Sequence, residues 1–343
     1  MIFGESTRLE WRFSLYGKRK CKMKVAYITA QAPYGKGETF IIEEMLAIKQ
    51  SGIEIIIFPR NPTRNIFNKK AEKILINTIW IPLVNIQMIT YFFGSFFKNR
   101  RLRKTCFKII KDSRKISILA KNFLIMPKAN YIAQRIKNSN VDHIHAHWGS
   151  TTSTMSYIIS ELTNIPWSFT LHRWDISENN ILKLKCSSAK FTRCICEDGK
   201  FELIELLGSQ FKNRIKIIHM GIQIPKVDTG LRKRNSRFII ICPANLRSKK
   251  GHCYLIKACK IVLDEGIKNY LCLIIGDGPL RSNLNSQIRK LNLSYYVKIL
   301  KRMPHEKLMQ MYEKKEVDVV ILPSIVDKDG EREGIPVALM EAM

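Results

Sequence analysis

Short runs of β-branched and aromatic residues alternate with longer helical patterns along the first half of the chain. Four of these runs predict strands, at Lys24–Thr29, Ile53–Pro59, His143–Ala146 and Trp167–Leu171, and the first is followed by a helical pattern over Phe40–Gln50. Strands that alternate with helices in this way are typical of a parallel α/β sheet. We therefore expect the first half of the chain to form an α/β domain.

The pattern changes after a strand-like run that ends in a glycine turn at Ile217–Gly221. Residues 222–236 are polar and basic and contain Pro225, and new strand patterns follow at Phe238–Cys242, Tyr270–Ile275 and Val317–Leu322. A chain of 343 residues is long enough for two domains. We expect one domain over residues 23–221, a linker over 222–236, and a second domain over 237–343, with residues 1–22 an extension that has no role in the fold.

The net charge of the chain predicts an anionic partner. Lys and Arg number 58 against 29 Asp and Glu, which gives a formal net charge of +29. No zinc-finger spacing, RNP-type strand or basic helix with a dimer repeat suggests nucleic acid, so we expect no nucleic-acid partner. An anionic membrane surface and phosphorylated substrates remain. The nine cysteines have no disulfide framework and indicate reduced thiols, as in a cytoplasmic protein.

One apolar segment allows two interpretations. Residues 78–97 are markedly apolar and aromatic, and a basic run, Lys98–Lys104, follows them. Pro82, Asn85 and Gln87 interrupt the apolar stretch, which argues against a membrane-spanning helix. The segment is either an interfacial element that binds anionic lipid or a core helix followed by a solvated basic turn.

Two segments of the first domain, a loop and a strand, contain residues that could bind a ligand. Pro33–Thr39 is a glycine-containing loop between a strand and a helix, where backbone N–H groups could approach a ligand. His143–His147 has three imidazoles on one face of a strand, a spacing that is compatible with a metal site. No nearby carboxylate or cysteine pattern supports the metal, so we expect no metal and histidines that pack and hydrogen-bond.

The last residues hold a pair of carboxylates, Glu333 and Glu341. Glu333 lies in a polar loop, and Gly334 and Pro336 open a helix that carries Glu341. At ~1.5 Å rise per residue the two carboxylates lie roughly 12 Å apart along the axis, enough to contact both ends of a nucleotide-sugar. This separation exceeds the ~5–9.5 Å of glycosidase carboxylate pairs, so the two look like binding groups rather than a hydrolase pair.

Five blocks in order carry a resemblance to a known family, from about Met23 to Met343. They are His143–His147, Phe169–Ile176, Pro243–His252, Ile274–Arg281 and Glu331–Met343. Together they resemble the family 4 retaining glycosyltransferases, especially those that build bacterial exopolysaccharide, capsule and lipopolysaccharide. The resemblance implies an α/β chain with the GT-B fold, in which two Rossmann-like domains face a cleft, the first on the acceptor side and the second binding the nucleotide-sugar.

The resemblance implies donor-binding residues in the second domain. Lys250 and Arg247 would neutralise the leaving diphosphate, with Arg247 in the place of an arginine variant because Asn245 stands where the family's arginine is common. Gly276 and Gly278 form a Gly-Asp-Gly-Pro turn beside the nucleotide; as a dinucleotide fingerprint this turn fails, because Arg281 replaces the third glycine. Further on, Glu333 would contact the donor hexose, the backbone of Gly334, Ile335 and Pro336 the phosphates, and Glu341 the ribose.

The resemblance also implies residues on the acceptor side. His172 would bind hydroxyls near the transferred sugar and is, with Glu333, a candidate catalytic residue; the alternative is a histidine that only caps a strand end. Asp175 would orient the His172 loop. The remaining acceptor-side candidates are Gly37, Glu38, Thr39 and His147.

The function implied is transfer of a hexose from a UDP- or GDP-sugar, without a metal or cofactor, to a lipid-linked or polysaccharide acceptor at the inner face of the plasma membrane. Two alternatives stay open: a GT-B enzyme that acts on a soluble acceptor, and a non-catalytic protein that binds nucleotide-sugar or polyanion. Family members continue beyond Glu341–Met343 with a further strand and a last helix. We therefore expect a second domain that is incomplete, and a fragment with weak activity or none.

Overall fold

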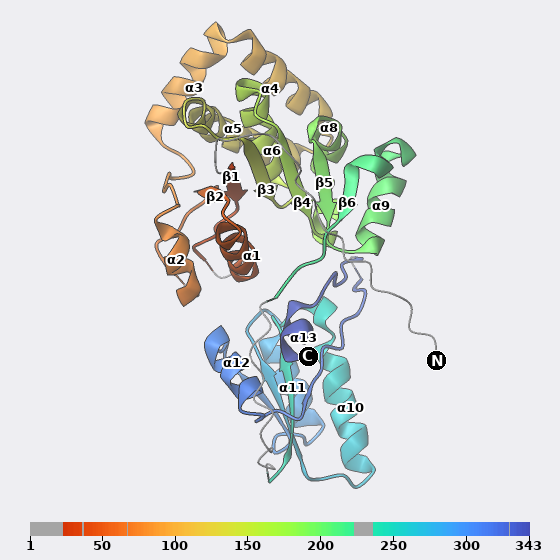
Figure 1. Cartoon of the computed structure of the whole chain (residues 1–343). Helices are drawn as coiled ribbons and strands as arrows, with labels where there is room; N and C mark the ends of the chain where they lie inside the picture. The colour runs from red at the N-terminus through yellow and green to blue at the C-terminus, as the bar shows by residue number, and fades with distance from the viewer. Residues whose placement is uncertain (1–22, 36–37, 67, 223–235, 329) are drawn as a thin grey trace, which may run out of the picture.

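The computed structural model describes residues 23–35, 38–66, 68–222, 236–328 and 330–343. These form two α/β units, each with its own parallel sheet and hydrophobic core (Figure 1). The first sheet ends at Ile217, and the second begins at Phe238. Two α/β units are what the sequence predicts.

The first unit is built on a six-stranded parallel sheet in the order β2-β1-β3-β4-β5-β6. Its strands are β1 (Lys24–Thr29), β2 (Glu54–Pro59), β3 (His143–His147), β4 (Trp167–Leu171), β5 (Phe191–Cys194) and β6 (Ile215–Ile217). Because every pair is parallel, the carboxyl ends of all the strands meet at one edge of the sheet. Loops at that edge can therefore converge on a single site.

Helices cover both faces of this sheet. Alternation along β1 sends Ala26 and Ile28 into the core under α5 and α6, and Val25 and Tyr27 into a smaller core under α1. The helices of the first unit are α1 (Thr39–Gln50), η1 (Lys69–Ala71), α2 (Glu72–Leu75), α3 (Ile86–Lys98), α4 (Arg100–Asp112), α5 (Ile116–Ile136), α6 (Thr151–Thr163), α7 (Arg173–Glu178), α8 (Leu182–Ser188), α9 (Glu197–Leu207) and η2 (Ser209–Arg214).

The second unit has a four-stranded parallel sheet in the order β10-β7-β8-β9. Its elements are β7 (Phe238–Pro243), η3 (Ser248–Lys250), α10 (His252–Asp264), β8 (Tyr270–Ile275), α11 (Arg281–Lys290), β9 (Val297–Leu300), α12 (His305–Glu313), β10 (Val319–Val320) and α13 (Val337–Ala342). Figure 1 shows α13 at the side of this unit that faces the first unit.

Several sequence predictions of individual elements need correction. The strand predicted over 317–322 is only Val319–Val320. At its start the carboxylate of Asp318 accepts the N–H of Ile239, and the N–H groups of Asp318 and Ile321 still donate to backbone oxygens of β7. The strand predicted to end at Gly221 is Ile215–Ile217. The apolar segment 78–97 is extended before α3 begins at Ile86, and α3 buries Met88 and Phe92 in the core.

In the described part of the chain, we find no helix with both the length and the apolar character that a membrane crossing requires.

Candidate functional site

A pocket of about 300 Å³ lies between the two units, where loops from both meet. The first unit contributes residues from the ends of β3 and β4 and from the start of α1. The second unit contributes the η3 loop and the segment that leads into α13. The lining includes Phe40, Trp148, His172, Arg173, Lys250 and residues 332–338. The pocket therefore contains His172, Lys250, Glu333 and Gly334–Pro336, which the sequence places on two different domains.

His172 is packed in a cluster of aromatic rings at the end of β4. Its Nε2 lies 2.9 Å from Nε2 of His147, and the rings of Trp148 and Phe40 lie 4.5 and 5.6 Å from the His172 ring, centroid to centroid. Trp148 has a φ of 85°, an unusual conformation for a non-glycine residue, and it turns its ring onto His172. Burial, followed by the nearby charge of Arg193, lowers the pKa of His172 to about 3. His172 is therefore neutral at physiological pH.

His147 lies behind His172 and is fully buried. Burial lowers its pKa well below the ordinary value, followed by the influence of His172. Because both Nε2 atoms share one hydrogen bond, one imidazole donates and the other accepts. His147 thus contacts the pocket through His172 and is not part of its lining.

Asp175 is fully buried beneath the same loop. Its Oδ2 accepts the backbone N–H of His172 at 2.9 Å, which fixes the start of α7. Burial raises the pKa of Asp175 to about 7, because the charged form is desolvated. Gly149 lies against it, and a Cβ at Gly149 would come within 3.0 Å of the Asp175 Cβ and 2.1 Å of a Leu171 methyl carbon. Glycine is therefore required for this close packing.

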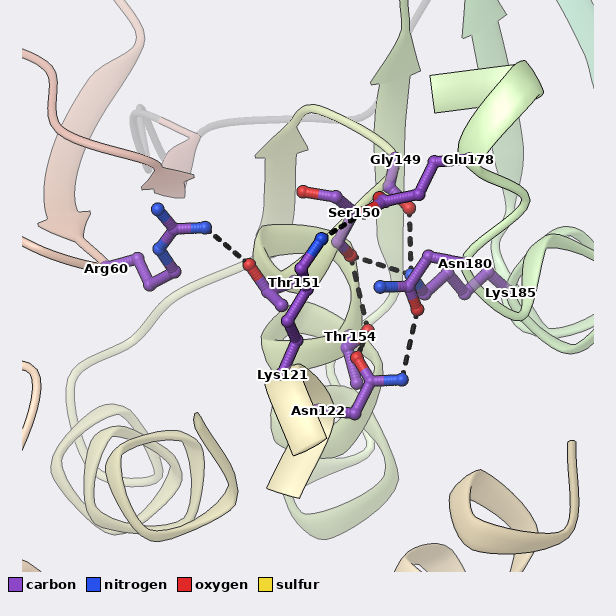
Figure 2. Close-up of polar contacts among 10 residues, drawn as sticks. All are labelled: Arg60, Lys121, Asn122, Gly149, Ser150, Thr151, Thr154, Glu178, Asn180 and Lys185. Atoms are coloured by element: carbon purple, nitrogen blue, oxygen red, sulfur yellow. Dashed lines mark hydrogen bonds and ion pairs between the residues drawn. The ribbon is translucent and has the colours of Figure 1, made fainter. Parts of the chain in front are cut away.

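Lys185 is buried on the other side of the Gly149 turn (Figure 2). Its Nζ donates to the carbonyl oxygens of Gly149 and Ser150 at 2.8 and 2.7 Å. Burial lowers its pKa to about 7, against the opposing charge of Asp175. Lys185 thus holds the loop between β3 and α6 in place, and no feature of the local sequence predicts this role.

Glu38 is held inside the loop that precedes α1. Its carboxylate accepts backbone N–H groups of Ala30, Gln31 and Ala32 and the indole N–H of Trp148. Its side chain is therefore occupied in fixing the end of β1. Among the other acceptor-side candidates, Thr39 is the first residue of α1, and Gly37 lies outside the described residues.

The histidines of β3 have a carboxylate neighbour that the sequence does not indicate. Ligand atoms of Glu44, His145 and His147 lie within 4.8 Å of one another, which corrects the expectation that no carboxylate is near. Glu44 forms an ion pair with buried Arg193. Both ring nitrogens of His145 are hydrogen-bonded, to the hydroxyl oxygens of Ser168 and Thr170 at 2.8 and 3.0 Å. These partners would have to be given up for a metal.

A larger cavity, of about 830 Å³, lies between α1 and the open face of the first sheet. Tyr27, His143, His145 and Arg193 line part of it, and the remaining lining is a mixture of aliphatic and polar or charged side chains. None of the residues predicted to bind the donor lines this cavity. We therefore place the candidate site in the smaller pocket between the units.

The basic loop of the second unit faces an acidic loop. Lys250 pairs with Glu333, and Lys249 Nζ lies 3.3 Å from Glu331. Ser248 also donates to Asp327 at 2.9 Å. Lys250, which the resemblance assigns to the leaving diphosphate, and Glu333, which it assigns to the donor hexose, thus neutralise each other in the pocket.

Four of the predicted donor-binding residues lie outside the lining of the pocket. Arg247 is exposed beside η3. Gly276 and Gly278 allow close contact between loops, since a Cβ at Gly276 would lie 2.0 Å from the Ala244 carbonyl oxygen. The carboxylate of Glu341, on α13, is hydrogen-bonded to His305 at 2.9 Å, and this bond raises the pKa of His305.

One polar contact across the units involves residues that the sequence analysis did not select. Glu202 on α9 pairs with buried Arg173 and with Arg332 of the acidic loop. Gly334 lies against the same surface, because a Cβ there would be 3.4 Å from Arg173 and 3.3 Å from Ile195. Charge pairing over such a sequence distance leaves no local signal in the sequence.

The second unit matches a known family. Residues 224–343 match the family described as "Glycosyl transferases group 1". A stretch of 131 residues is 37% identical to the amylovoran biosynthesis glycosyltransferase AmsK of Erwinia amylovora, and covers 38% of this chain and 31% of that protein. A stretch of 133 residues is 32% identical to the putative colanic acid biosynthesis glycosyltransferase WcaL of Escherichia coli K12, and covers 38% of this chain and 32% of that protein. The matched part of the chain spans about a third of the length of these relatives.

The fold also matches solved structures. A crystal structure of a glycosyltransferase from Rickettsia africae ESF-5 aligns with a TM-score of 0.59 at 19% identity, covering 94% of this chain and 77% of that chain. The two Rossmann-like units therefore have the GT-B arrangement, which confirms the predicted fold class. The match to the glycosyltransferase group 1 family falls on the second unit of this fold.

Proposed function

We propose that this chain is a retaining glycosyltransferase that moves a hexose from a UDP- or GDP-sugar to a lipid-linked or polysaccharide acceptor in exopolysaccharide biosynthesis. The observation that carries the proposal is the pocket in which Lys250 and Glu333 of a glycosyltransferase group 1 domain face His172 of the other unit. The matched relatives are named as glycosyltransferases of amylovoran and colanic acid biosynthesis, and these names support a role in exopolysaccharide biosynthesis.

On the donor side, fixed cations meet the charge that develops on the leaving diphosphate. Lys250 is paired with Glu333, so its ammonium must exchange this carboxylate for the diphosphate. The exchange frees Glu333 to accept hydrogen bonds from hydroxyls of the donor hexose. Arg247, exposed beside the same loop, adds a second cation, and Glu341 exchanges His305 for the ribose hydroxyls. No metal is needed in this scheme.

On the acceptor side, His172 positions the attacking hydroxyl. With a pKa of about 3 the imidazole is neutral and a weak base, so it orients the hydroxyl by a hydrogen bond rather than taking its proton. In the front-face mechanism that we propose, a phosphate oxygen of the leaving group takes the proton, and the new bond forms on the side that the diphosphate leaves. Retention of the anomeric configuration follows.

For a lipid-linked acceptor we propose that the chain acts at the cytoplasmic face of an anionic membrane. Part of α4 and α5 exposes large apolar side chains, among them Phe107, Ile110, Ile116 and Phe123. The exposed cations Arg100, Arg101 and Lys104 lie on α4 beside Phe107. Figure 1 shows α3 and α4 at the end of the first unit that lies away from the second unit. Apolar side chains flanked by cations suit an anionic bilayer surface.

Donor binding tests the proposal. Titration of the chain with UDP, GDP and their glucose, galactose and mannose conjugates should give saturable binding of one nucleotide series. Glu333→Gln should weaken the sugar conjugate more than the free nucleotide, and Lys250→Gln should weaken both. Lys260→Gln, which removes an exposed charge from α10, is the matched control and should change neither. Binding that is equal in all variants and disappears with salt would instead indicate nonspecific charge.

A further inference from the structure

A second group of polar side chains lies next to the interdomain pocket, at the N-terminal end of α6 (Figure 2). The N-cap residue of this 13-residue helix, Ser150, makes no capping hydrogen bond with its side chain. Thr151, Thr152 and Ser153 are buried, so their N–H groups are shielded from bulk water. An uncapped helix start has N–H donors that the helix itself does not use, together with a partial positive charge.

Asn180 supplies an independent observation at this helix end. It is fully buried, and its Oδ1 accepts from Asn122 Nδ2 at 3.0 Å and from Lys185 Nζ at 3.3 Å. These two donors fix the orientation of the amide, because a flipped amide would direct its NH₂ group at them. Nδ2 of Asn180 is left without a hydrogen-bond partner among the described residues. In Figure 2 this nitrogen points toward the N-terminal end of α6. A buried donor of this kind is available to an acceptor atom of a ligand.

Basic side chains lie on both sides of the N-terminal end of α6. Arg60, which follows β2, donates from Nη1 to Thr151 Oγ1 at 2.6 Å, and its burial lowers its pKa from the ordinary value. Lys185 fixes an ammonium behind the same end through the carbonyl oxygens of Gly149 and Ser150. An anion placed at this end would meet donors and positive charge from two directions.

Glu178 is the carboxylate that faces this group. Its Oε1 lies 2.8 Å from Lys121 Nζ, which neutralises its charge. Its Oε2 is buried and has no hydrogen-bond partner in the part of the chain that the structure describes. This oxygen can therefore accept a hydrogen bond from a hydroxyl group beside the anion.

We propose that these residues, which we call the α6 site (Arg60, Ser150, Thr151, Glu178 and Asn180), bind the phosphate of a phosphorylated saccharide. The phosphate oxygens accept from Arg60, from the first N–H groups of α6 and from Nδ2 of Asn180. A sugar hydroxyl donates to Oε2 of Glu178. The site recognises both parts of the ligand, since the phosphate accepts at the start of α6 and the sugar hydroxyl donates to Glu178.

The position of the α6 site connects it to the proposed function. Trp148 lines the interdomain pocket, and Ser150 is two residues further along the chain, a reach of at most about 7 Å. If the proposed transfer is correct, the ligand is the acceptor, with its phosphate at α6 and its attacking hydroxyl toward His172. The binding site itself does not depend on that transfer.

Calorimetric titration with glucose 1-phosphate, in the presence of saturating UDP and GDP to occupy the donor pocket, tests the site. Asn180→Asp keeps the acceptor for Asn122 and Lys185 but replaces the inward NH₂ group with an anionic oxygen. Arg60→Gln removes the cation. Each change loses at least one charge-assisted hydrogen bond, so binding should weaken about 10- to 100-fold. Arg289→Gln, an exposed charge on α11, is the control. Circular dichroism and melting temperature verify that each variant is folded. If Asn180→Asp does not fold, Arg60→Gln alone decides the result.

The outcomes separate the α6 site from the donor site. Binding that is lost in Lys250→Gln but kept in both α6 variants would assign the phosphate to the donor pocket and overturn the proposal. Glucose binding as tightly as glucose 1-phosphate, or no binding of glucose 1-phosphate, would also overturn it. Binding at α6 with no donor binding would refute the transferase and leave the α6 site standing. Tighter binding of farnesyl-diphosphate-linked glucose than of glucose 1-phosphate would identify a lipid-linked ligand. Tighter binding of glucose 1-phosphate would identify a soluble sugar phosphate. Both results support the site.

Discussion

At the scale of single residues, the ends of the strands in the first unit are fixed by buried polar groups. Glu38, Asp175 and Lys185 each bind backbone groups of a neighbouring loop, and the pocket residues Trp148 and His172 are held by the first two. The geometry of the pocket therefore depends on side chains that do not reach a ligand.

Glu38→Gln should destabilise the chain strongly. The carboxylate accepts from three backbone N–H groups and one indole N–H, and an amide would turn its own NH₂ toward some of these donors. Leaving buried donors unsatisfied costs about 1–3 kcal/mol each, so we expect a loss of about 3–5 kcal/mol in urea unfolding. Glu43→Gln breaks a partly exposed pair with Lys70 and should cost less than about 1 kcal/mol. Equal losses in the two variants would contradict this role of Glu38.

His145 should make stability depend on pH. Burial, the largest cause, lowers its pKa from 6.5 to about 3. Between these values the unfolded chain binds a proton at this position and the folded chain does not, so the free energy of unfolding falls as the pH decreases below about 6.5, by up to about 1.4 kcal/mol per pH unit. Above that pH the effect vanishes.

His145→Gln isolates this contribution. We expect the stability of the variant to decline less steeply between about pH 6 and 4, by up to about 1.4 kcal/mol per pH unit. The gap between the two proteins at pH 8 measures the lost hydrogen bonds to Ser168 and Thr170 and serves as the reference. Parallel curves from pH 8 to pH 4 would show that His145 is not held neutral.

At the scale of elements, the sequence predicts the longer apolar strands well and the short strands poorly. The bounds of β1, β4 and β8 agree with the predicted ranges, because strands buried on both faces form unbroken apolar runs. β5 and β9 are short and carry an Arg or a Lys, and the sequence analysis missed both; it found β6, which is also short, but placed it over 217–221. Their order in the sheet rests on pairing with distant strands, which a local pattern does not contain.

The residues of the candidate site also divide into those that the sequence predicts and those that it does not. Residues at strand ends, such as His172, and in the loop before α13, such as Glu333, were found because they belong to contiguous motifs. Glu44 and Glu202 were not, since their partners Arg193 and Arg332 are more than a hundred residues away. Contacts across the sheet and between the units require the fold.

The pair of helices α4 and α5 should bind anionic membranes. Phe123 is 55% exposed and borders a hollow formed with Ile110, Ile116 and Leu124. Phe123→Asp removes a large apolar contact and adds a negative charge, so partition onto vesicles with 30% phosphatidylglycerol should weaken by about tenfold or more. Phe201→Asp, at a residue 63% exposed on α9, is the matched control and should bind as the unchanged chain does. Equal loss in both variants, or no binding to begin with, would remove the membrane from the proposal.

At the scale of the whole molecule, the two units are joined at the acidic loop. Arg332 pairs with Glu202 of α9, while the neighbouring Glu333 pairs with Lys250 of its own unit. Gly334 packs on Ile195 and Arg173 of the first unit. The segment that is proposed to contact the donor sugar is therefore positioned by both units at once, so contacts made outside the pocket should affect donor affinity.

Arg332→Gln tests this coupling without disturbing the buried pair of Arg173 and Glu202. The Arg332 side chain is 42% exposed, so its pair with Glu202 should contribute about 0.2–1 kcal/mol and its loss should weaken binding of the nucleotide-sugar by up to about fivefold. The melting temperature should barely change. Lys328→Gln removes an equal charge from the same loop, at an exposed residue, and should leave the affinity as it is. If both variants lower the affinity alike, the effect is one of net charge, and high salt would then abolish the difference from the unchanged chain. If only Arg332→Gln lowers it, the link between the units holds the donor loop in its binding position.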